Sequence, residues 1–317
     1  MTDAPDPDAA PESSALSRRR WPWVVGGAAT LTIAVGVALA VSGLTAAPDA
    51  APAPSPTSTA VTTPSPAPTS TPTPTPTVAE FPANTVAYDP AGLAQVDVFA
   101  VNAGLPIDDD PYAVPSEAIA TPRAAGAPVF ADPTAEPIGF LPATLPFDGT
   151  SVPVVERQEH WLKVLLVGRQ AVPSQGNAAQ VAGWVRAADV DVVPSDAHVE
   201  VAIGARTIDI VRGGERQTIA TDFAWGTDAT PTPLGRSYIM TTRVVPEFGY
   251  TRGHPIVYLS VQSPTLDGFG GADAAVTAFH YHDERSGAIS NGCVRVDPAA
   301  IAALAELPQG TPVLINP

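Results

Sequence analysis

The sequence predicts a mainly β protein of two small domains carried on a single N-terminal transmembrane helix. Three observations predict this architecture. Residues 24–47 form an uncharged and largely apolar run, residues 48–78 are almost wholly Pro, Thr, Ser and Ala, and short β-type runs follow from about residue 81. Only residues 297–307 have the pattern of a helix in the part that follows the linker.

The N-terminal segment has the layout of a membrane anchor. Three arginines, residues 18–20, precede Trp21, Trp23 and the apolar run. The run is long enough to cross a bilayer, the arginines place residues 1–20 in the cytoplasm, and the tryptophans suit the membrane interface. We therefore expect a transmembrane anchor over residues 21–47; cleavage after a signal peptide near residues 44–47 is the alternative. In both cases the rest of the chain lies outside the cell.

Residues 48–80 form a predicted linker, since repeated Thr-Pro pairs favour an extended polyproline spacer and cannot build a core. The whole chain carries a net charge of −16 and a single lysine, Lys163. Because neutralising phosphates requires clustered Lys and Arg, this balance excludes a nucleic-acid partner.

The first predicted domain covers residues 81–195. A strand is expected at 95–101 and a turn at 108–111, and a small β-barrel is predicted by runs at 127–131, 152–156, 161–167 and 182–185. The segments around Trp161 and Trp184 resemble bacterial SH3-like domains. That resemblance implies a barrel that binds wall material or positions the next domain, with both tryptophans expected in its core.

The second predicted domain covers residues 196–317. Strands are expected at 199–203, 207–211, 216–220, 237–242, 256–261, 276–282 and 312–316. The helix at 297–307 has Asp297 as its cap, Pro298 at its first position, and Ile301, Leu304 and Leu307 on its apolar face.

The single cysteine, Cys293, is the candidate nucleophile. One Cys forms no intramolecular disulfide, and an unpaired thiol outside the cell needs a chemical role. A thiol attacks a carbonyl as thiolate, so it needs a nearby base. His280 and His282 lie two apart on a predicted strand and therefore share a face, so either could face the thiol.

The residues around Cys293 suit attack on a carbonyl. Gly292 allows close approach of the backbone, and the N–H groups of residues 292 and 293 could stabilise an oxyanion. Ser290 and Asn291 share this loop, and Asn291 keeps an amide for orienting or oxyanion contacts. Arg295 faces the same side as Cys293 in an extended segment and could bind a carboxylate.

The run Ser290-Asn291-Gly292-Cys293-Val294-Arg295 resembles the catalytic motif of the L,D-transpeptidase (YkuD) family, and residues 230–235 are similar to that family's Thr-Pro-x-Gly segment. The resemblance covers about 120 residues and implies a β-sandwich catalytic domain. Two departures stand out: His280 precedes Tyr281 where the family usually has Gly, and Asn291 replaces a commoner His. The short loop to Cys293 favours His280 as base, with His282 as the alternative.

The resemblance implies a cysteine acyltransferase on peptidoglycan stem peptides that forms 3-3 cross-links through a thioester, is acylated by carbapenem-type inhibitors and uses no cofactor. It also implies that a main-chain carbonyl near residue 281 orients the imidazole. Hydrolysis of stem peptides and non-catalytic wall binding are the alternatives. A buried structural Cys293 and a metal site at His280, His282, Asp283 and Cys293 are weaker readings, since the loop is polar and no zinc-type spacing occurs. A Ser-x-x-Lys serine enzyme is excluded, because His160 stands three before the only lysine.

Overall fold

The structure is a computed structural model that describes residues 80–270 and 272–317, all within one compact unit. The predicted tail, residues 1–20, the predicted anchor, residues 21–47, and nearly all of the predicted linker lie outside the described residues. Within the described part of the chain, no helix is both long and apolar enough to cross a membrane.

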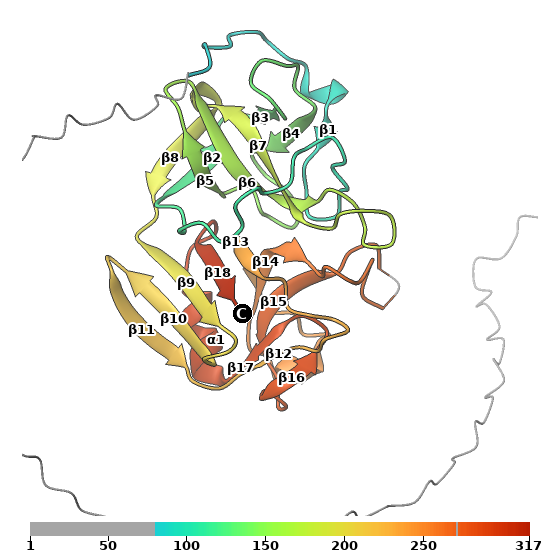
Figure 1. The fold of residues 1–317 in the computed structure, drawn as a ribbon, viewed down its shortest axis with the longest axis vertical. Coiled ribbons are helices and arrows are strands. Elements are labelled where there is room, and N and C mark those ends of the chain that lie inside the picture. The colour runs from blue at the N-terminus through green and yellow to red at the C-terminus, as the bar shows by residue number, and fades with distance from the viewer. Residues whose placement is uncertain (1–79, 271) are drawn as a thin grey trace, which may run out of the picture. The chain divides into compact units, whose positions relative to one another are not determined.

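The N-terminal β region, residues 80–195, contains two sheets (Figure 1). The three-stranded sheet has the order β1 (Ala94–Gln95), β4 (Gly139–Pro142), β3 (Gly126–Val129). The five-stranded sheet has the order β7 (Gln180–Arg186), β6 (Trp161–Arg169), β5 (Val152–Arg157), β2 (Ala118–Pro122), β8 (Val190–Pro194). Two short 3-10 helices complete it, η1 (Pro90–Gly92) and η2 (Ala187–Asp189).

The two tryptophans of this region are core residues, as predicted. Trp161 and Trp184 are buried, and both belong to a small cluster with Phe130, whose ring meets that of Trp161 edge-on at 5.0 Å. The indole N–H of Trp161 donates to the carbonyl of Pro82 at 2.9 Å. Both rings are thus used in packing, since Phe81 also meets the Trp184 ring edge-on at 5.6 Å.

The predicted strand at 95–101 is wrong beyond its first residue. Only Ala94–Gln95 pairs as a strand, and a turn follows. The Asp97 carboxylate accepts the N–H of Phe99 at 2.7 Å, and the Asp97 carbonyl accepts the N–H of Ala100 at 3.2 Å. An aspartate that bonds the backbone two residues on competes with strand pairing, which ends the strand.

The C-terminal region forms one ten-stranded sheet that curls as a half-barrel (Figure 1). The prediction named a β-sandwich; here the strands that enclose the core belong to a continuous sheet because β13 pairs with both β14 and β18. Its order is β11 (Glu215–Ala220), β10 (Thr207–Arg212), β9 (Ala197–Ala202), β18 (Pro312–Asn316), β13 (Gly235–Arg243), β14 (Ile256–Gln262), β15 (Val276–Tyr281), β17 (Val294–Val296), β12 (Ala224–Gly226), β16 (Gly287–Ser290). A 3-10 turn, η3 (Gly249–Thr251), follows β13.

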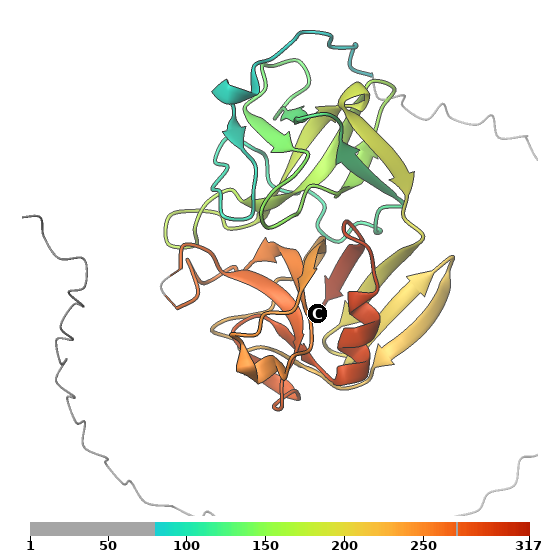
Figure 2. The ribbon, with the colours of Figure 1, turned by 180° about the vertical axis from the view of Figure 1, so that it is seen from behind.

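The predicted helix is present as α1 (Pro298–Ala305), seen clearly from behind in Figure 2. The Asp297 carboxylate caps it by accepting the N–H groups of Ala299 and Ala300 at 2.8 and 2.9 Å. Ile301 and Leu304 are fully buried, and the helix contacts β11, β14 and β15. The helix therefore covers the core directly behind the strands that carry the candidate site.

The two β regions share a hydrophobic core although no sheet crosses between them. Tyr238 and Met240 of β13 are fully buried in the core cluster that the N-terminal strands build. Asp108 and Arg236 form a buried ion pair across the same boundary, at 2.5 Å between Oδ1 and Nη2. A shared core and a buried ion pair fix one region against the other.

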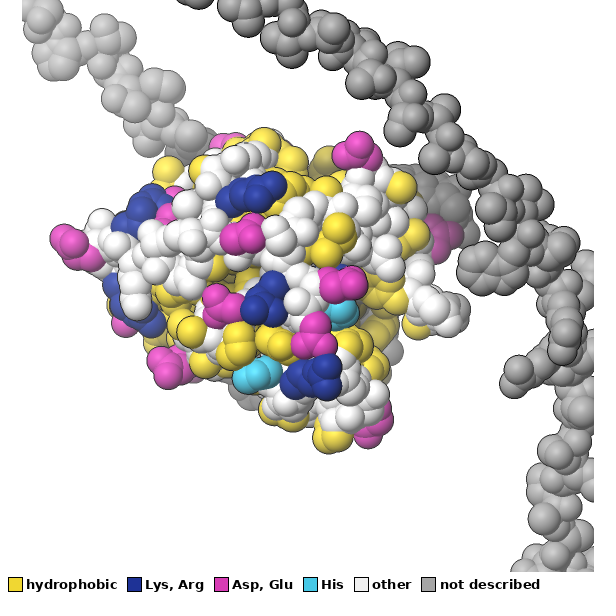
Figure 3. All heavy atoms as spheres, turned by 90° about the horizontal axis from the view of Figure 1, so that it is seen from below, with side chains coloured by type: hydrophobic (Ala, Val, Ile, Leu, Met, Phe, Trp, Pro, Cys, Tyr) yellow, Lys and Arg dark blue, Asp and Glu magenta, His cyan; other side chains and the backbone are white. Residues whose placement is uncertain are grey.

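The surface mixes charges of both signs. On the face shown in Figure 3, acidic and basic side chains lie interspersed among neutral ones. No basic stripe of the kind that follows a nucleic-acid backbone is visible on that face.

Candidate active site

One cavity of about 620 Å³ collects the residues that the sequence singled out. Of the seven predicted site residues, all except Gly292 line it. Gly292 is buried beside the cavity, immediately before the candidate nucleophile. The predicted residues that line the cavity are Cys293, His280, His282, Ser290, Asn291 and Arg295.

Two parallel strands bring the histidines to the thiol. β15 pairs with β17 so that His280 lies opposite Arg295, and Cys293 directly precedes β17. Strand alternation then separates the faces: Phe279 is fully buried in the core behind the sheet, whereas His280 and His282 line the cavity, as predicted. Their ring centroids are 6.3 Å apart.

The hydrogen bonds of the two histidines differ in a way that matters chemically. Nδ1 of His280 lies 2.9 Å from the carbonyl oxygen of Tyr281, so it carries the proton and leaves Nε2 free to accept one. Nδ1 of His282 instead accepts the N–H of Glu284 at 3.0 Å. Neutral His282 therefore carries its proton on Nε2 and has no free acceptor nitrogen.

Burial keeps both reacting groups neutral at rest. It lowers the pKa of His280 to about 4, against a smaller raising effect of the Tyr281 carbonyl. It also raises the pKa of the Cys293 thiol to about 11, although a backbone hydrogen bond from Ala278 and the charge of Arg295 lower it somewhat. The thiol thus needs a base at the moment of attack, and His280 is unprotonated and able to serve.

Ser290 shapes the loop that presents the thiol. Its hydroxyl donates to the carbonyl of Cys293 at 2.6 Å and accepts the N–H of Gly292 at 3.1 Å. The hydroxyl of Thr230 donates to the carbonyl of Ser290 at 3.1 Å and lies 3.4 Å from Oδ1 of Asn291. The predicted Thr-Pro segment therefore braces the nucleophile loop from outside.

Gly292 has a backbone conformation that favours glycine. Its φ is +111°, and a Cβ there would lie 3.3 Å from the carbonyl oxygen of Pro231. Its N–H is already engaged by Ser290. The expected oxyanion contact at this position is therefore occupied in the free protein, which leaves the Cys293 N–H and the Asn291 amide as candidates.

Arg295 lines the cavity and has hydrogen-bond donors that are not used by the described residues. Its Nη1 donates only a long bond, 3.4 Å, to the carbonyl of Glu284. Its Nε is buried and meets no hydrogen-bond partner among the described residues. A guanidinium with an unsatisfied donor is suited to a carboxylate.

Sequence reasoning missed the aromatic wall of the cavity. Tyr250 and Tyr258 line it, as do Phe99 and Phe147 from the N-terminal β region. Burial, the neighbouring Tyr250 and Cys293 together raise the pKa of Tyr258 to about 12. These residues come from segments far apart in the chain, so no local pattern could have linked them to Cys293.

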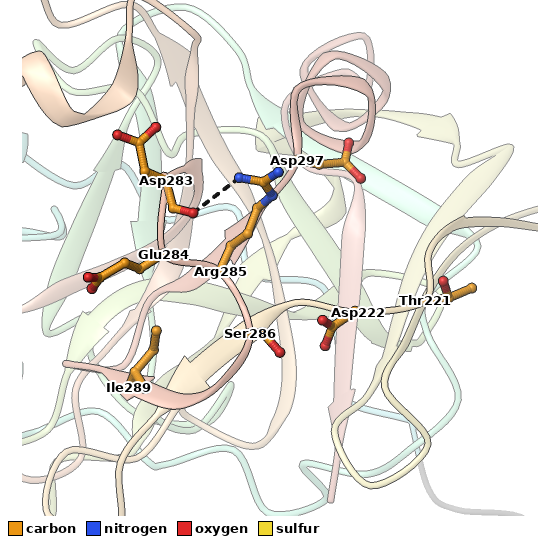
Figure 4. A pocket seen from close by; sticks show the side chains of 8 residues that line it. All are labelled: Thr221, Asp222, Asp283, Glu284, Arg285, Ser286, Ile289 and Asp297. Carbon is orange, nitrogen blue, oxygen red and sulfur yellow. Dashed lines mark hydrogen bonds between the residues drawn. The ribbon is translucent and has the colours of Figure 1, made fainter.

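A second, larger cavity of about 830 Å³ contains no nucleophile from the motif (Figure 4). Three of its carboxylates are already engaged: Asp283 accepts from Arg252 at 2.5 Å and from Tyr281, Asp222 lies 3.5 Å from Arg206, and Asp297 caps α1. Figure 4 shows Arg285 turned back to the carbonyl of Asp283. We therefore assign the candidate site to the smaller cavity.

Comparison with known proteins places the C-terminal region in a family. The L,D-transpeptidase catalytic domain (YkuD) matches residues 196–315. No curated protein matches the chain at a significant level.

Solved structures that resemble the chain include several L,D-transpeptidases. A mutant Enterococcus faecium L,D-transpeptidase is 22% identical over 38% of this chain and 50% of its own, with a TM-score of 0.27. The Mycobacterium smegmatis L,D-transpeptidase is 12% identical over 52% and 99%, with a TM-score of 0.30. L,D-transpeptidase 1 of Mycobacterium tuberculosis is 18% identical over 43% and 78%, with a TM-score of 0.27. The chain thus spans half the length of the Enterococcus enzyme.

The family match covers the motif at Ser290–Arg295 and does not extend to residues 80–195. Residues 196–315 are an L,D-transpeptidase (YkuD) catalytic domain.

Proposed function

We propose that the chain is a cysteine-dependent L,D-transpeptidase that forms 3-3 cross-links in peptidoglycan, or attaches groups to stem peptides, through a thioester. One observation carries the proposal. The hydrogen bond from Nδ1 of His280 to the Tyr281 carbonyl leaves Nε2 as a free base in the cavity that contains the Cys293 thiol. The family match at residues 196–315 supports the reaction class.

In the first half-reaction, Cys293 attacks the carbonyl of the L-centre that precedes the terminal D-Ala of a tetrapeptide stem. The thiol proton passes to Nε2 of His280 as the carbon–sulfur bond forms. The Cys293 N–H and the Asn291 amide stabilise the oxyanion of the tetrahedral intermediate. When this intermediate collapses, the D-Ala amine takes the proton from His280 and leaves, and the thioester remains.

In the second half-reaction, a side-chain amine of a neighbouring stem attacks the thioester. His280 removes a proton from the amine, and the collapse returns that proton to the sulfur, which regenerates Cys293. The unsatisfied guanidinium of Arg295 binds a carboxylate of the substrate. His282 has its acceptor nitrogen engaged and contributes to the wall of the cavity.

The proposal also includes a membrane anchor, a linker, an SH3-like module and sensitivity to carbapenem-type inhibitors. Residues 21–47 anchor the chain in the cell membrane with residues 1–20 in the cytoplasm, and the Pro-rich linker carries the catalytic domain towards the wall. The N-terminal β region is an SH3-like module. Carbapenem-type inhibitors acylate Cys293, because a strained amide carbonyl suits the same thiol.

Product analysis tests the reaction. The full chain and a Cys293→Ala variant are incubated with purified tetrapeptide muropeptides, and the products are identified by mass. Cross-linked dimer formed by the wild type and not by the variant supports transpeptidation. Tripeptide alone would instead show a hydrolase, and identical wall binding by both proteins without any product would show a non-catalytic binding protein.

A further inference from the structure

One wall of the Cys293 cavity is a loop between β14 and β15. Phe269, Gly270, Ala272 and Asp273 of this loop line the same cavity as Cys293 and His280. The described residues of the loop form no helix or strand. Its position therefore depends on other contacts: bonds within the loop, a bond from Thr265 to the carbonyl of Ala229, and several bonds to the N-terminal β region.

Arg169, at the end of β6, holds the loop through hydrogen bonds to its carbonyl groups. Its side chain is nearly completely buried, and Nη1 donates to the carbonyl of Leu266 at 3.1 Å. Nη2 donates to the carbonyls of Asp267 and Asp273. A buried guanidinium that is satisfied by carbonyls of one loop fixes where those carbonyls lie, because losing any of them leaves a charge unpaired.

Two further contacts tie the loop to the same region. The N–H and hydroxyl of Ser174 donate to the two carboxylate oxygens of Asp267 at 3.0 and 2.6 Å. At the base of the loop, the Gln262 amide donates to the carbonyl of Val98 at 2.6 Å and accepts the N–H of Ala275 at 2.9 Å. The loop is thus held at its base and along its length.

The N-terminal β region also reaches the cavity itself. Phe147 meets the ring of Tyr258 edge-on at 5.1 Å, and Phe99 meets Phe147 at 5.6 Å. Phe99 remains 55% exposed at the cavity. Exposed aromatic rings beside a cavity supply contact area for a ligand at low entropic cost.

We propose that the N-terminal β region forms part of the donor-binding site, an inference that rests on the proposed transpeptidase function. Arg169 and Asp267 are positioning residues that fix the loop wall. Phe99 and Phe147 contact the donor tetrapeptide stem as it extends from Cys293. The region therefore determines how well the donor stem binds, in addition to any role as a spacer.

Binding of a tetrapeptide stem to the full chain tests the inference. In a Cys293→Ala background, Phe99→Ala and Asp267→Ala are each compared by calorimetry with a matched control, Tyr112→Ala and Asp196→Ala. Both control residues are exposed and lie outside the cavity. We expect Kd to rise about fivefold or more for Phe99→Ala, the size of one lost aromatic contact. A rise of similar size is expected for Asp267→Ala, because the loop wall loses its bonds to Ser174, and a rise of less than about twofold for the controls.

Kinetics and rescue distinguish positioning from folding. With Cys293 intact, Phe99→Ala and Asp267→Ala should raise KM for the donor while kcat stays within about twofold, since the chemistry at the thiol is untouched. Arg169→Gln should raise KM further, and Arg169→Lys should recover part of the loss. Unchanged midpoints of thermal unfolding for Phe99→Ala and Asp267→Ala, both at exposed positions, would show that the fold is intact.

The outcomes separate the two proposals. If the wild type forms dimer but the variants bind donor as well as their controls do, the inference fails and the function stands. If the wild type forms no product but donor binding weakens in the variants alone, the function fails and the inference stands. No measurable donor binding in the Cys293→Ala background overturns the inference.

Discussion

At the residue scale, the hydrogen bonds of His280 and His282 distinguish the two candidate bases. From the sequence, both histidines were candidates, since strand spacing gives them a common face. The carbonyl of Tyr281 accepts from Nδ1 of His280 and so leaves its Nε2 free, whereas the N–H of Glu284 donates to Nδ1 of His282 and so occupies its acceptor. Neither contact could be predicted from spacing, because both depend on how the chain turns after β15.

The pKa of His280 predicts the pH at which the acylation rate falls on the acid side of its pH profile. The imidazole must be unprotonated to accept the thiol proton, and its pKa is lowered to about 4. We expect kcat/KM for acylation of Cys293 to be insensitive to His280 protonation above about pH 5 and to fall below about pH 4. Rates of carbapenem acylation against pH provide the measurement. An acid limb near the ordinary histidine pKa, about 6.5, would contradict this assignment.

The same lowered pKa makes stability depend on pH. The unfolded chain binds a proton at His280 below about pH 6.5, whereas the folded chain does so only near pH 4. Stability is therefore complete above about pH 6.5 and lost as pH falls towards 4, by on the order of 3 kcal/mol. Urea unfolding at both ends of this window measures it. His280→Asn should lose that dependence, whereas replacement of the half-buried His160 by Asn should keep it.

At the scale of the elements, short strands position Cys293, the proposed nucleophile. The long strands β6, β13, β14 and β15 were predicted within a few residues, because their runs rich in apolar, β-branched and aromatic residues are visible locally. β12, β16 and β17, which surround Cys293, have three or four residues each and were missed. Such short strands form because neighbouring strands supply their hydrogen bonds, and these neighbours are distant in the sequence, so no local pattern predicts them.

Loss of the Ser290 hydroxyl tests the nucleophile loop. Ser290→Ala removes the donor to the Cys293 carbonyl and the acceptor of the Gly292 N–H, so the loop relaxes around the thiol. We expect a fall in free energy of unfolding of about 1–3 kcal/mol, together with a fall in kcat of about tenfold. Chemical denaturation and turnover measure the two effects. Ser286→Ala, an exposed position in the preceding turn, should change neither; equal effects would show that the bonds of Ser290 are unimportant.

The two β regions behave as one structure at the scale of the whole molecule. The change of sheet falls near the predicted boundary at residue 195, since β8 ends at Pro194 and β9 begins at Ala197. The hydrophobic core extends across that boundary, because Tyr238 and Met240 pack among the N-terminal strands. Sequence patterns give each region its strands but say nothing of which faces meet, so the shared core and the aromatic wall could not be predicted.

Unfolding of both regions together follows from the shared core. Asp108→Asn breaks the buried ion pair with Arg236 and should cost about 3–5 kcal/mol, because it leaves a buried charge uncompensated. Asp109→Asn removes an exposed partner of Lys163 and should cost less than about 1 kcal/mol. Hydrogen exchange should show β6 and β15 losing protection together in Asp108→Asn. Loss confined to the N-terminal strands would mean that the regions unfold independently.

Trapping the acyl-enzyme tests whether Cys293 is the nucleophile and His280 its base. The full chain is mixed with a tetrapeptide stem, quenched in acid and digested, and the mass of the peptide that contains Cys293 is measured. We expect a thioester adduct on Cys293 equal to the stem minus its terminal D-Ala, abundant in the wild type and strongly reduced in His280→Gln. Release of D-Ala without an adduct on Cys293, or an adduct that forms equally well in His280→Gln, would contradict these roles.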